Sequence, residues 1–138
     1  MIEVMIRCCA AAGIVISGYF LLLQWRILQP ENPRIPRWCR LGVGGCASLL
    51  NSPESRVFGI PNTLVAFVFY AAALSLPFHP LEAIFLIGSI FSAAMGAYLA
   101  FVLLRRLKIS CVLCFTIHII NFALALLFII HASQWHGL

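Results

Sequence analysis

Four long apolar stretches constrain the fold of this chain more than any other feature of its sequence. They cover residues 8–28, 60–76, 81–104 and 109–130, and the last contains no Asp, Glu, Lys or Arg. A transmembrane helix needs about 20 predominantly apolar residues. With 63% hydrophobic and only 9% charged residues, the composition is typical of a membrane protein. The sequence therefore predicts an all-α membrane protein, with four transmembrane helices in a single domain over residues 1–138.

The last apolar stretch opens with the motif Cys111-Val112-Leu113-Cys114. Ser110 is a candidate N-cap, which would put Cys111 on the first turn of the helix. There the helix dipole and the basic residues just before the motif favour the thiolate. A rise of about 1.5 Å per residue places Cys114 roughly 4.5 Å deeper, on nearly the same face. A C-x-x-C motif by itself serves redox and metal sites alike. At the mouth of a membrane helix, we interpret it as a redox site.

A second cysteine pair, Cys39 and Cys46, lies in the polar segment between the first two apolar stretches. Four antiparallel helices would put this loop and the short loop at residues 105–108 on one side of the membrane. Both termini and the turn at residues 77–80 would lie on the other side. Two dithiol pairs on one face can relay electrons by thiol–disulfide exchange.

Polar residues within the apolar stretches are candidates for a ligand site. Asn62 lies just inside the membrane on the cysteine side, where it either caps the second helix or donates to a quinone carbonyl. His118 and Asn121 follow Cys114 by four and seven residues, so all three can share one helix face. An intramembrane His is a functional candidate, although a packed, hydrogen-bonded His is an equally good interpretation.

Other notable residues are assigned to packing or to the membrane surface. Cys8 and Cys9 are adjacent, cannot easily bridge each other, and are expected to pack as small apolar side chains. Glu82 is expected to be solvated at the membrane edge, and His131 to be merely interfacial. The net charge is +5, but the sequence contains no nucleic-acid-binding motif. We therefore assign the basic residues to loops beside the membrane.

Taken together, these motifs resemble the vitamin K epoxide reductase family over nearly the whole chain. The resemblance rests on Cys39 and Cys46, on Ser52, on Phe-Gly-Ile-Pro-Asn at residues 58–62, and on the C-x-x-C motif. It implies a four-helix bundle around a quinone site, capped by the cysteine-bearing loop between the first and second helices. It also implies that the C-x-x-C pair passes electrons to a quinone of the ubiquinone, menaquinone or vitamin K type.

The resemblance assigns a role to each cysteine by position. Cys39 is implied to exchange disulfides with a thioredoxin-like partner, and Cys46 to bridge to Cys111. Cys114 is implied to face the quinone. Many bacterial members carry a fused thioredoxin-like domain, and this chain ends at Leu138 without one. A separate thioredoxin-like partner protein is therefore expected.

The resemblance also implies cofactor-binding residues. Asn62 matches a position that hydrogen-bonds the quinone, and Phe69 and Tyr70 match the aromatic wall of the quinone site. His118 departs from the pattern, because animal members carry a tyrosine there. Recognition of the quinone ring is therefore expected to differ.

These features predict a membrane thiol–quinone oxidoreductase that reoxidises a thioredoxin-like protein and so drives disulfide formation. The first alternative has the same chemistry but serves mainly to reduce vitamin K epoxide or quinone. The second alternative is a non-catalytic membrane module with a four-cysteine zinc site. We expect no metal, because Cys114 lies within an apolar stretch that offers no metal-binding loop. The expected partners are a quinone, membrane lipids and the thioredoxin-like protein, with no nucleic acid.

The orientation in the membrane is predicted differently by two arguments. Only Arg7 lies on the terminal side, whereas eight of the nine Lys and Arg residues lie on the cysteine side: Arg26, Arg34, Arg37, Arg40, Arg56, Arg105, Arg106 and Lys108. The positive-inside rule would place the cysteine side in the cytoplasm, whereas disulfide formation belongs in an oxidising compartment. We expect a bacterial inner-membrane protein with a periplasmic cysteine face, and keep the inverted topology as the alternative.

Overall fold

The computed structural model describes residues 1–28, 53–108 and 111–135. Cys39, Cys46, Ser52 and Ser110 lie outside the described residues. Within them the chain is mostly helical, with four main helices: α1 (Ile2–Gln24), α3 (Asn62–Ser75), α4 (Glu82–Val102) and α5 (Val112–Trp135). The shorter elements are the 3-10 helices η1 (Pro53–Ser55) and η2 (His79–Leu81), the π-helical turn η3 (Leu103–Leu107), and the strands β1 (Arg56–Val57) and β2 (Ile60–Pro61).

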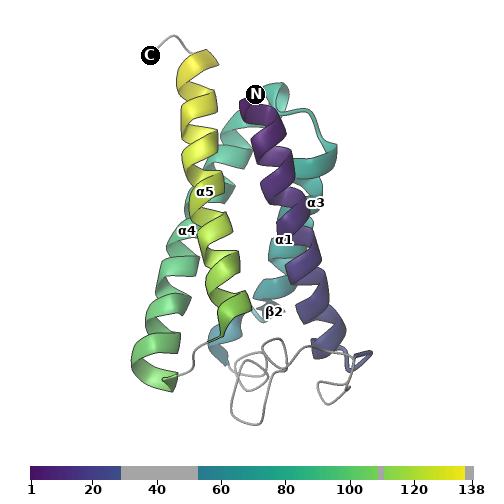
Figure 1. The fold of residues 1–138 in the computed structure, drawn as a ribbon, viewed down its shortest axis with the longest axis vertical. Helices are drawn as coiled ribbons and strands as arrows, with labels where there is room; N and C mark the ends of the chain where they lie inside the picture. Colours follow the sequence, from purple (N-terminus) through teal and green to yellow (C-terminus); the bar gives the residue numbers. More distant parts are fainter. Residues whose placement is uncertain (29–52, 109–110, 136–138) are drawn as a thin grey trace.

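Consecutive helices run in opposite directions (Figure 1). The start of α1, the end of α5 and the connection from α3 to α4 lie together at one end, called here the terminal end. The β-hairpin, η3 and the start of α5 lie at the opposite end, called the cysteine end because Cys111 is there. The predicted antiparallel order of the helices is therefore observed.

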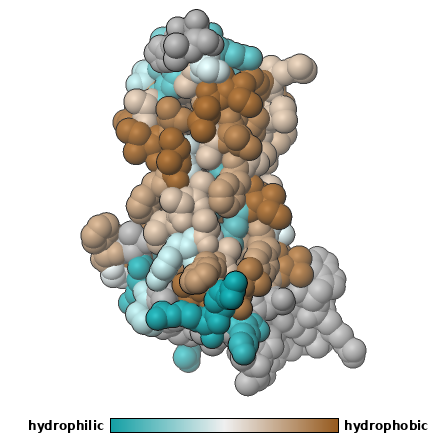
Figure 2. Space-filling view, turned by 90° about the vertical axis from the view of Figure 1, so that its left-hand side faces the viewer, coloured by the Kyte–Doolittle hydropathy of each residue, from teal (hydrophilic) through white to brown (hydrophobic). Residues whose placement is uncertain are grey.

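Three helical segments are long and apolar enough to cross a membrane: Ile2–Gln24, His79–Arg106 and Val112–Gln134. In Figure 2, apolar side chains cover most of the molecule between its two ends, and hydrophilic ones gather at the ends, most of all at the cysteine end. The remaining helix, α3, has 14 residues. It rises about 21 Å, which is less than the roughly 30 Å of a bilayer's hydrocarbon core. The all-helical prediction is confirmed, while the fourth crossing stays a prediction.

The first helix differs from its predicted bounds, since α1 begins at Ile2 and ends at Gln24. Its end is set by Arg26, which adopts a left-handed conformation with φ 58°. The N–H of Arg26 donates to the carbonyl of Leu23, and the N–H of Ile27 donates to that of Leu22. This is the hydrogen-bond pattern of a Schellman motif, which ends a helix. The predicted stretch runs on to residue 28 because Ile27 and Leu28 are apolar, but its apolar core ends at Gln24-Trp25-Arg26, where the helix also ends.

The core near the terminal end is aromatic. Tyr70 is completely buried and lies against Gly13 of α1, where an added Cβ would come within 2.7 Å of its ring. The rings of Phe78, Phe85 and Phe128 pack with centroids 5.5 Å apart in each pair. The absence of a side chain at Gly13 therefore allows α1 and α3 to approach closely around Tyr70.

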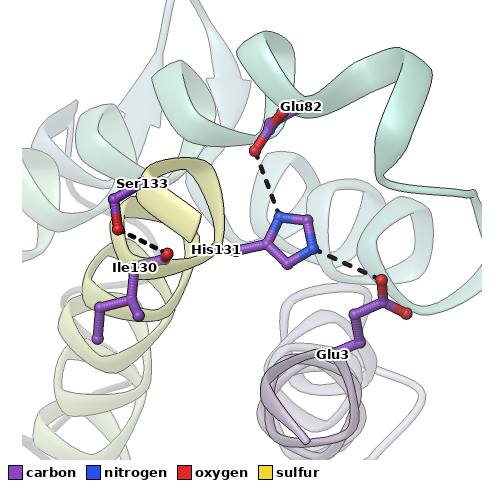
Figure 3. A network of polar contacts seen from close by, with 5 residues as sticks. All are labelled: Glu3, Glu82, Ile130, His131 and Ser133. Carbon is purple, nitrogen blue, oxygen red and sulfur yellow. Dashed lines mark hydrogen bonds and ion pairs between the residues drawn. The ribbon is translucent and has the colours of Figure 1, made fainter. Parts of the chain in front are cut away.

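A polar network also joins the helices at the terminal end (Figure 3). His131 lies between two carboxylates, with its Nδ1 3.3 Å from Oε1 of Glu82 and its Nε2 3.5 Å from Oε1 of Glu3. Arg7 donates to the carbonyl of Leu74, in the last turn of α3. The side chains of His131 and Glu82 are only 14% and 12% exposed. The expectations of a solvated Glu82 and a merely interfacial His131 are therefore wrong, because packing of the helix ends buries both.

Candidate functional site

A cavity of about 200 Å³ lies within the bundle, with walls contributed by α1, α3, α4 and α5. Most of the surface that lines it is apolar, and its apolar lining residues are Phe20, Val65, Ala66, Phe69, Gly88, Phe91, Met95, Gly96, Leu99 and Ile117. Its polar lining residues are Ser17, Gln24, Ser55, Asn62, Thr63, Ser92, Cys114, His118 and Asn121. An apolar cavity with a few convergent polar groups is the usual form of a small-molecule site.

The C-x-x-C motif lies at the N-terminus of α5. The N–H of Phe115 donates to the carbonyl of Cys111 over 3.1 Å, so Cys111 accepts the first bond of the helix, as an N-cap residue does. Cys111 therefore precedes the first turn of α5, one step earlier than predicted, and Cys114 lies within that turn. Both cysteines are 7% exposed and pack against Phe20 of α1 and Leu103 of η3.

The two cysteines of the motif are in different covalent states. Cys111 is disulfide-bonded, whereas Cys114 carries a thiol that is not part of a disulfide. The motif is therefore not closed on itself, and the bonding partner of Cys111 lies outside the described residues. Only Cys114 lines the cavity. Cys114 thus provides a thiol at the cavity, while the sulfur of Cys111 is part of a disulfide with a cysteine other than Cys114.

His118 follows Cys114 by one turn of α5 and is 8% exposed. Its Nδ1 is buried and has no hydrogen-bond partner among the residues that the structure describes. Buried polar atoms are nearly always hydrogen-bonded, so an unpaired nitrogen in the wall of a cavity indicates a position where a ligand can bind. Among the described residues, Nδ1 of His118 therefore lacks the hydrogen bond that the interpretation as a packed histidine requires, and ligand binding by His118 stays a prediction.

Two further predicted residues lie in the same cavity wall. Asn62 is the first residue of α3, and its side chain lines the cavity. The N-cap of that helix is Pro61, and no side chain in the described part of the chain caps it. Asn62 is therefore not the N-cap of α3, and its role as a ligand-binding residue stays a prediction. Phe69 and Gly88 both line the cavity and lie against each other. A Cβ added at Gly88 would lie 2.9 Å from the ring of Phe69.

Tyr70 does not line the cavity. Its ring is completely buried in the core, and its hydroxyl donates a hydrogen bond to Oδ1 of Asn121. Asn121 does line the cavity. The structure thus places Tyr70 behind the wall, in contact with a wall residue, instead of in the wall itself. Successive helix residues point about 100° apart, so Phe69 and Tyr70 cannot both face the cavity squarely.

Sequence reasoning missed several polar residues near the cysteine end of the cavity, among them a pair that joins two helices. The hydroxyl of Thr63 donates to Oε1 of Gln24 over 2.9 Å, which joins α3 to α1. Both residues line the cavity. The available signal was a glutamine within an otherwise apolar stretch, at about the same depth as Asn62.

Comparisons with known proteins place this geometry in context. A model of the Vitamin K epoxide reductase family matches residues 4–129, which is nearly the whole chain. A search of curated proteins gave no match. The family match covers α1, α3, α4, the C-x-x-C motif and most of α5.

Proposed function

The chain belongs to the vitamin K epoxide reductase family, and on that basis we propose that it is a membrane oxidoreductase that passes electrons from protein thiols to a quinone. The observation that carries this proposal is the composition of the cavity wall. One apolar cavity brings the thiol of Cys114 together with Nδ1 of His118, which no group in the described part of the chain hydrogen-bonds. A thiol donates electrons, and a buried nitrogen can bind a carbonyl oxygen.

The chemistry requires that two electrons and two protons leave the thiols. A bound quinone would accept both the electrons and the protons. Cys114 and Cys111, once both are reduced, become joined as a disulfide and release the two electrons and the two protons. The Cys111–Cys114 disulfide is then reduced again by thiol–disulfide exchange with a second dithiol. The net result is that one dithiol is oxidised for each quinone reduced.

We assign the second dithiol to Cys39 and Cys46. Cys46 would form the disulfide with Cys111, and Cys39 would exchange with a separate thioredoxin-like protein. The disulfide-bonded state of Cys111 supports this assignment, since its sulfur is already bonded to a cysteine other than Cys114. A zinc site would need four thiolates, and a disulfide-bonded sulfur is not available as one.

The cavity wall fits a quinone ring. A quinone has two carbonyl oxygens, which accept hydrogen bonds, on opposite sides of a flat apolar ring. Asn62 from α3 and His118 from α5 come from different helices and provide nitrogen atoms for these oxygens. Phe69 provides an aromatic face for the ring. We expect a ubiquinone, menaquinone or vitamin K type of quinone.

We propose that α3 is the fourth crossing of the membrane, with the β-hairpin and the segment before η2 completing its length. Because disulfide formation belongs in an oxidising compartment, we propose that the cysteine end faces the periplasm of a bacterial inner membrane. A membrane-impermeant thiol reagent applied to intact cells, after mild reduction, should label Cys39 if this orientation is correct. Labelling only after the membrane is opened would show the inverted topology.

The electron path is tested with single cysteine variants of the purified protein. Cys114→Ser and Cys111→Ser should each abolish quinone-dependent oxidation of a dithiol, because one sulfur alone cannot close a disulfide. Cys8→Ser is the matched control, since Cys8 is exposed on α1 and does not line the cavity. Activity within a few-fold of wild type in either motif variant would overturn the proposal. Comparing the reaction rates with a vitamin K epoxide and with a quinone as the electron acceptor would show which of the two the enzyme mainly reduces.

A further inference from the structure

Asn121 connects the cavity with the core of the bundle. Asn121 is one of the residues that line the cavity, and its Oδ1 accepts a hydrogen bond from the hydroxyl of Tyr70. Its Nδ2 lies 3.5 Å from the carbonyl oxygen of Ser92, at the limit of a hydrogen bond. A side-chain amide has two N–H donors. Within residues 1–28, 53–108 and 111–135, the second N–H of Asn121 has no acceptor.

Two neighbours select the same orientation of the Asn121 amide. The hydroxyl of Tyr70 donates to the amide oxygen, and the carbonyl of Ser92 can only accept a hydrogen bond. Turning the amide over would bring two acceptors together at Ser92, which is unfavourable. Tyr70 and Ser92 therefore keep Nδ2 of Asn121 on one side and Oδ1 on the other.

Nδ2 of Asn121 and Nδ1 of His118 lie beside the same point on α4. An added Cβ at Gly96 would be 3.1 Å from Nδ1 of His118 and 3.5 Å from Nδ2 of Asn121. Gly96 itself lines the cavity. Two nitrogen atoms with unused hydrogen-bonding capacity are therefore close to each other in the cavity wall, and a carbonyl oxygen can accept from two donors.

We propose that Asn121 contacts the quinone, donating from Nδ2 to the carbonyl oxygen beside His118, and that Tyr70 is a positioning residue that acts through Asn121. This inference rests on the proposed quinone reaction. Tyr70 has no surface in the cavity, so its hydroxyl affects a bound quinone only by holding the Asn121 amide. Without this hydrogen bond only the long contact with the carbonyl of Ser92 restrains the amide, and the donor is held less firmly toward the ligand.

A double-mutant cycle tests both parts of the inference through the affinity for a soluble quinone analogue. Tyr70→Phe removes only the hydroxyl and should raise the Kd about fivefold to tenfold, as expected for one lost hydrogen bond. Asn121→Leu should raise the Kd at least as much. The double variant should bind no more weakly than Asn121→Leu, because Tyr70 acts only through Asn121. Additive losses would overturn the positioning role.

Infrared spectroscopy of an analogue with ¹³C-labelled carbonyl groups provides a readout that packing alone would not change. In the wild-type complex the carbonyl band should lie below its frequency in an apolar solvent, because hydrogen bonding weakens the C=O bond. In Tyr70→Phe and Asn121→Leu the band should move back toward the solvent value. An unchanged band in Asn121→Leu would overturn the proposed contact, even if Tyr70→Phe did not fold.

Tyr98→Phe is the matched control, since Tyr98 is half exposed on α4 and does not line the cavity. It should leave both the Kd and the carbonyl band unchanged. If the wild-type protein does not bind the analogue, the proposed quinone reaction itself is contradicted. If the wild type binds and Tyr70→Phe binds equally well, only the positioning role of Tyr70 is contradicted.

Discussion

The imidazole of His131, near the end of α5, lies 3.3 Å from the carboxylate of Glu82 at the start of α4, and both side chains are largely buried. These residues are 49 positions apart in the chain. Glu3 of α1 contacts the opposite nitrogen of the same ring but is 58% exposed. Three helices therefore meet at one imidazole, at the end of the bundle opposite Cys111 and Cys114.

We predict that removing Glu82 from this contact destabilises the bundle more than removing Glu3. Glu82→Gln keeps the shape but loses the charge on the buried side of His131, and should lower the thermal midpoint in detergent by several degrees. Exposed ion pairs contribute little, so Glu3→Gln should change the midpoint by much less. Thermal denaturation of the two variants side by side measures the difference. Equal effects would contradict the importance of burial at this contact.

A second prediction concerns the close approach of α1 to α3. Gly13→Ala would place a Cβ 2.7 Å from the ring of Tyr70, and overpacking of this kind costs about 1–3 kcal/mol. It should lower the thermal midpoint and, by displacing Tyr70, also weaken quinone binding. Gly18→Ala is the control on the same helix, because its Cβ would be 3.5 Å from Phe67, an ordinary contact. A normal midpoint for Gly13→Ala would show that Tyr70 can shift without cost.

A third prediction concerns Asn62. Asn62→Ala should raise the quinone KM by roughly 5- to 150-fold, which corresponds to the loss of one buried hydrogen bond worth about 1–3 kcal/mol. Because Pro61 is the N-cap of α3, helix content should not change, and circular dichroism checks this. Disulfide exchange between Cys46 and Cys111 should remain intact. An unchanged KM would mean that Asn62 does not contact the quinone.

A fourth prediction separates the two dithiol pairs. With Cys39 replaced by Ala, a thioredoxin-like protein should no longer be oxidised, because its partner in disulfide exchange is missing. A small dithiol should still be oxidised, since it can reach the disulfide of Cys111 directly. Rates with both substrates, measured on the same preparation, check the prediction. Normal oxidation of the protein substrate would assign the exchange to another cysteine.

The sequence by itself determined the all-helical fold, the order of the helices and the family. Apolar stretches of about 20 residues predict membrane helices, because the length and hydropathy of a stretch can be read directly from the sequence. The position of His118 one turn after Cys114 followed from helix periodicity alone. Both residues line the cavity, together with Asn62 and Phe69.

Only the tertiary structure decided which polar groups meet. Tyr70 lies behind the cavity wall and reaches Asn121, 51 residues away. Glu82 and His131 are buried against each other instead of being exposed at the membrane edge. Such contacts leave no local pattern in the sequence, because they depend on how helices rotate and pack. Glycines such as Gly13 and Gly96 set how closely those helices approach, and the packing then determines which side chains face the cavity.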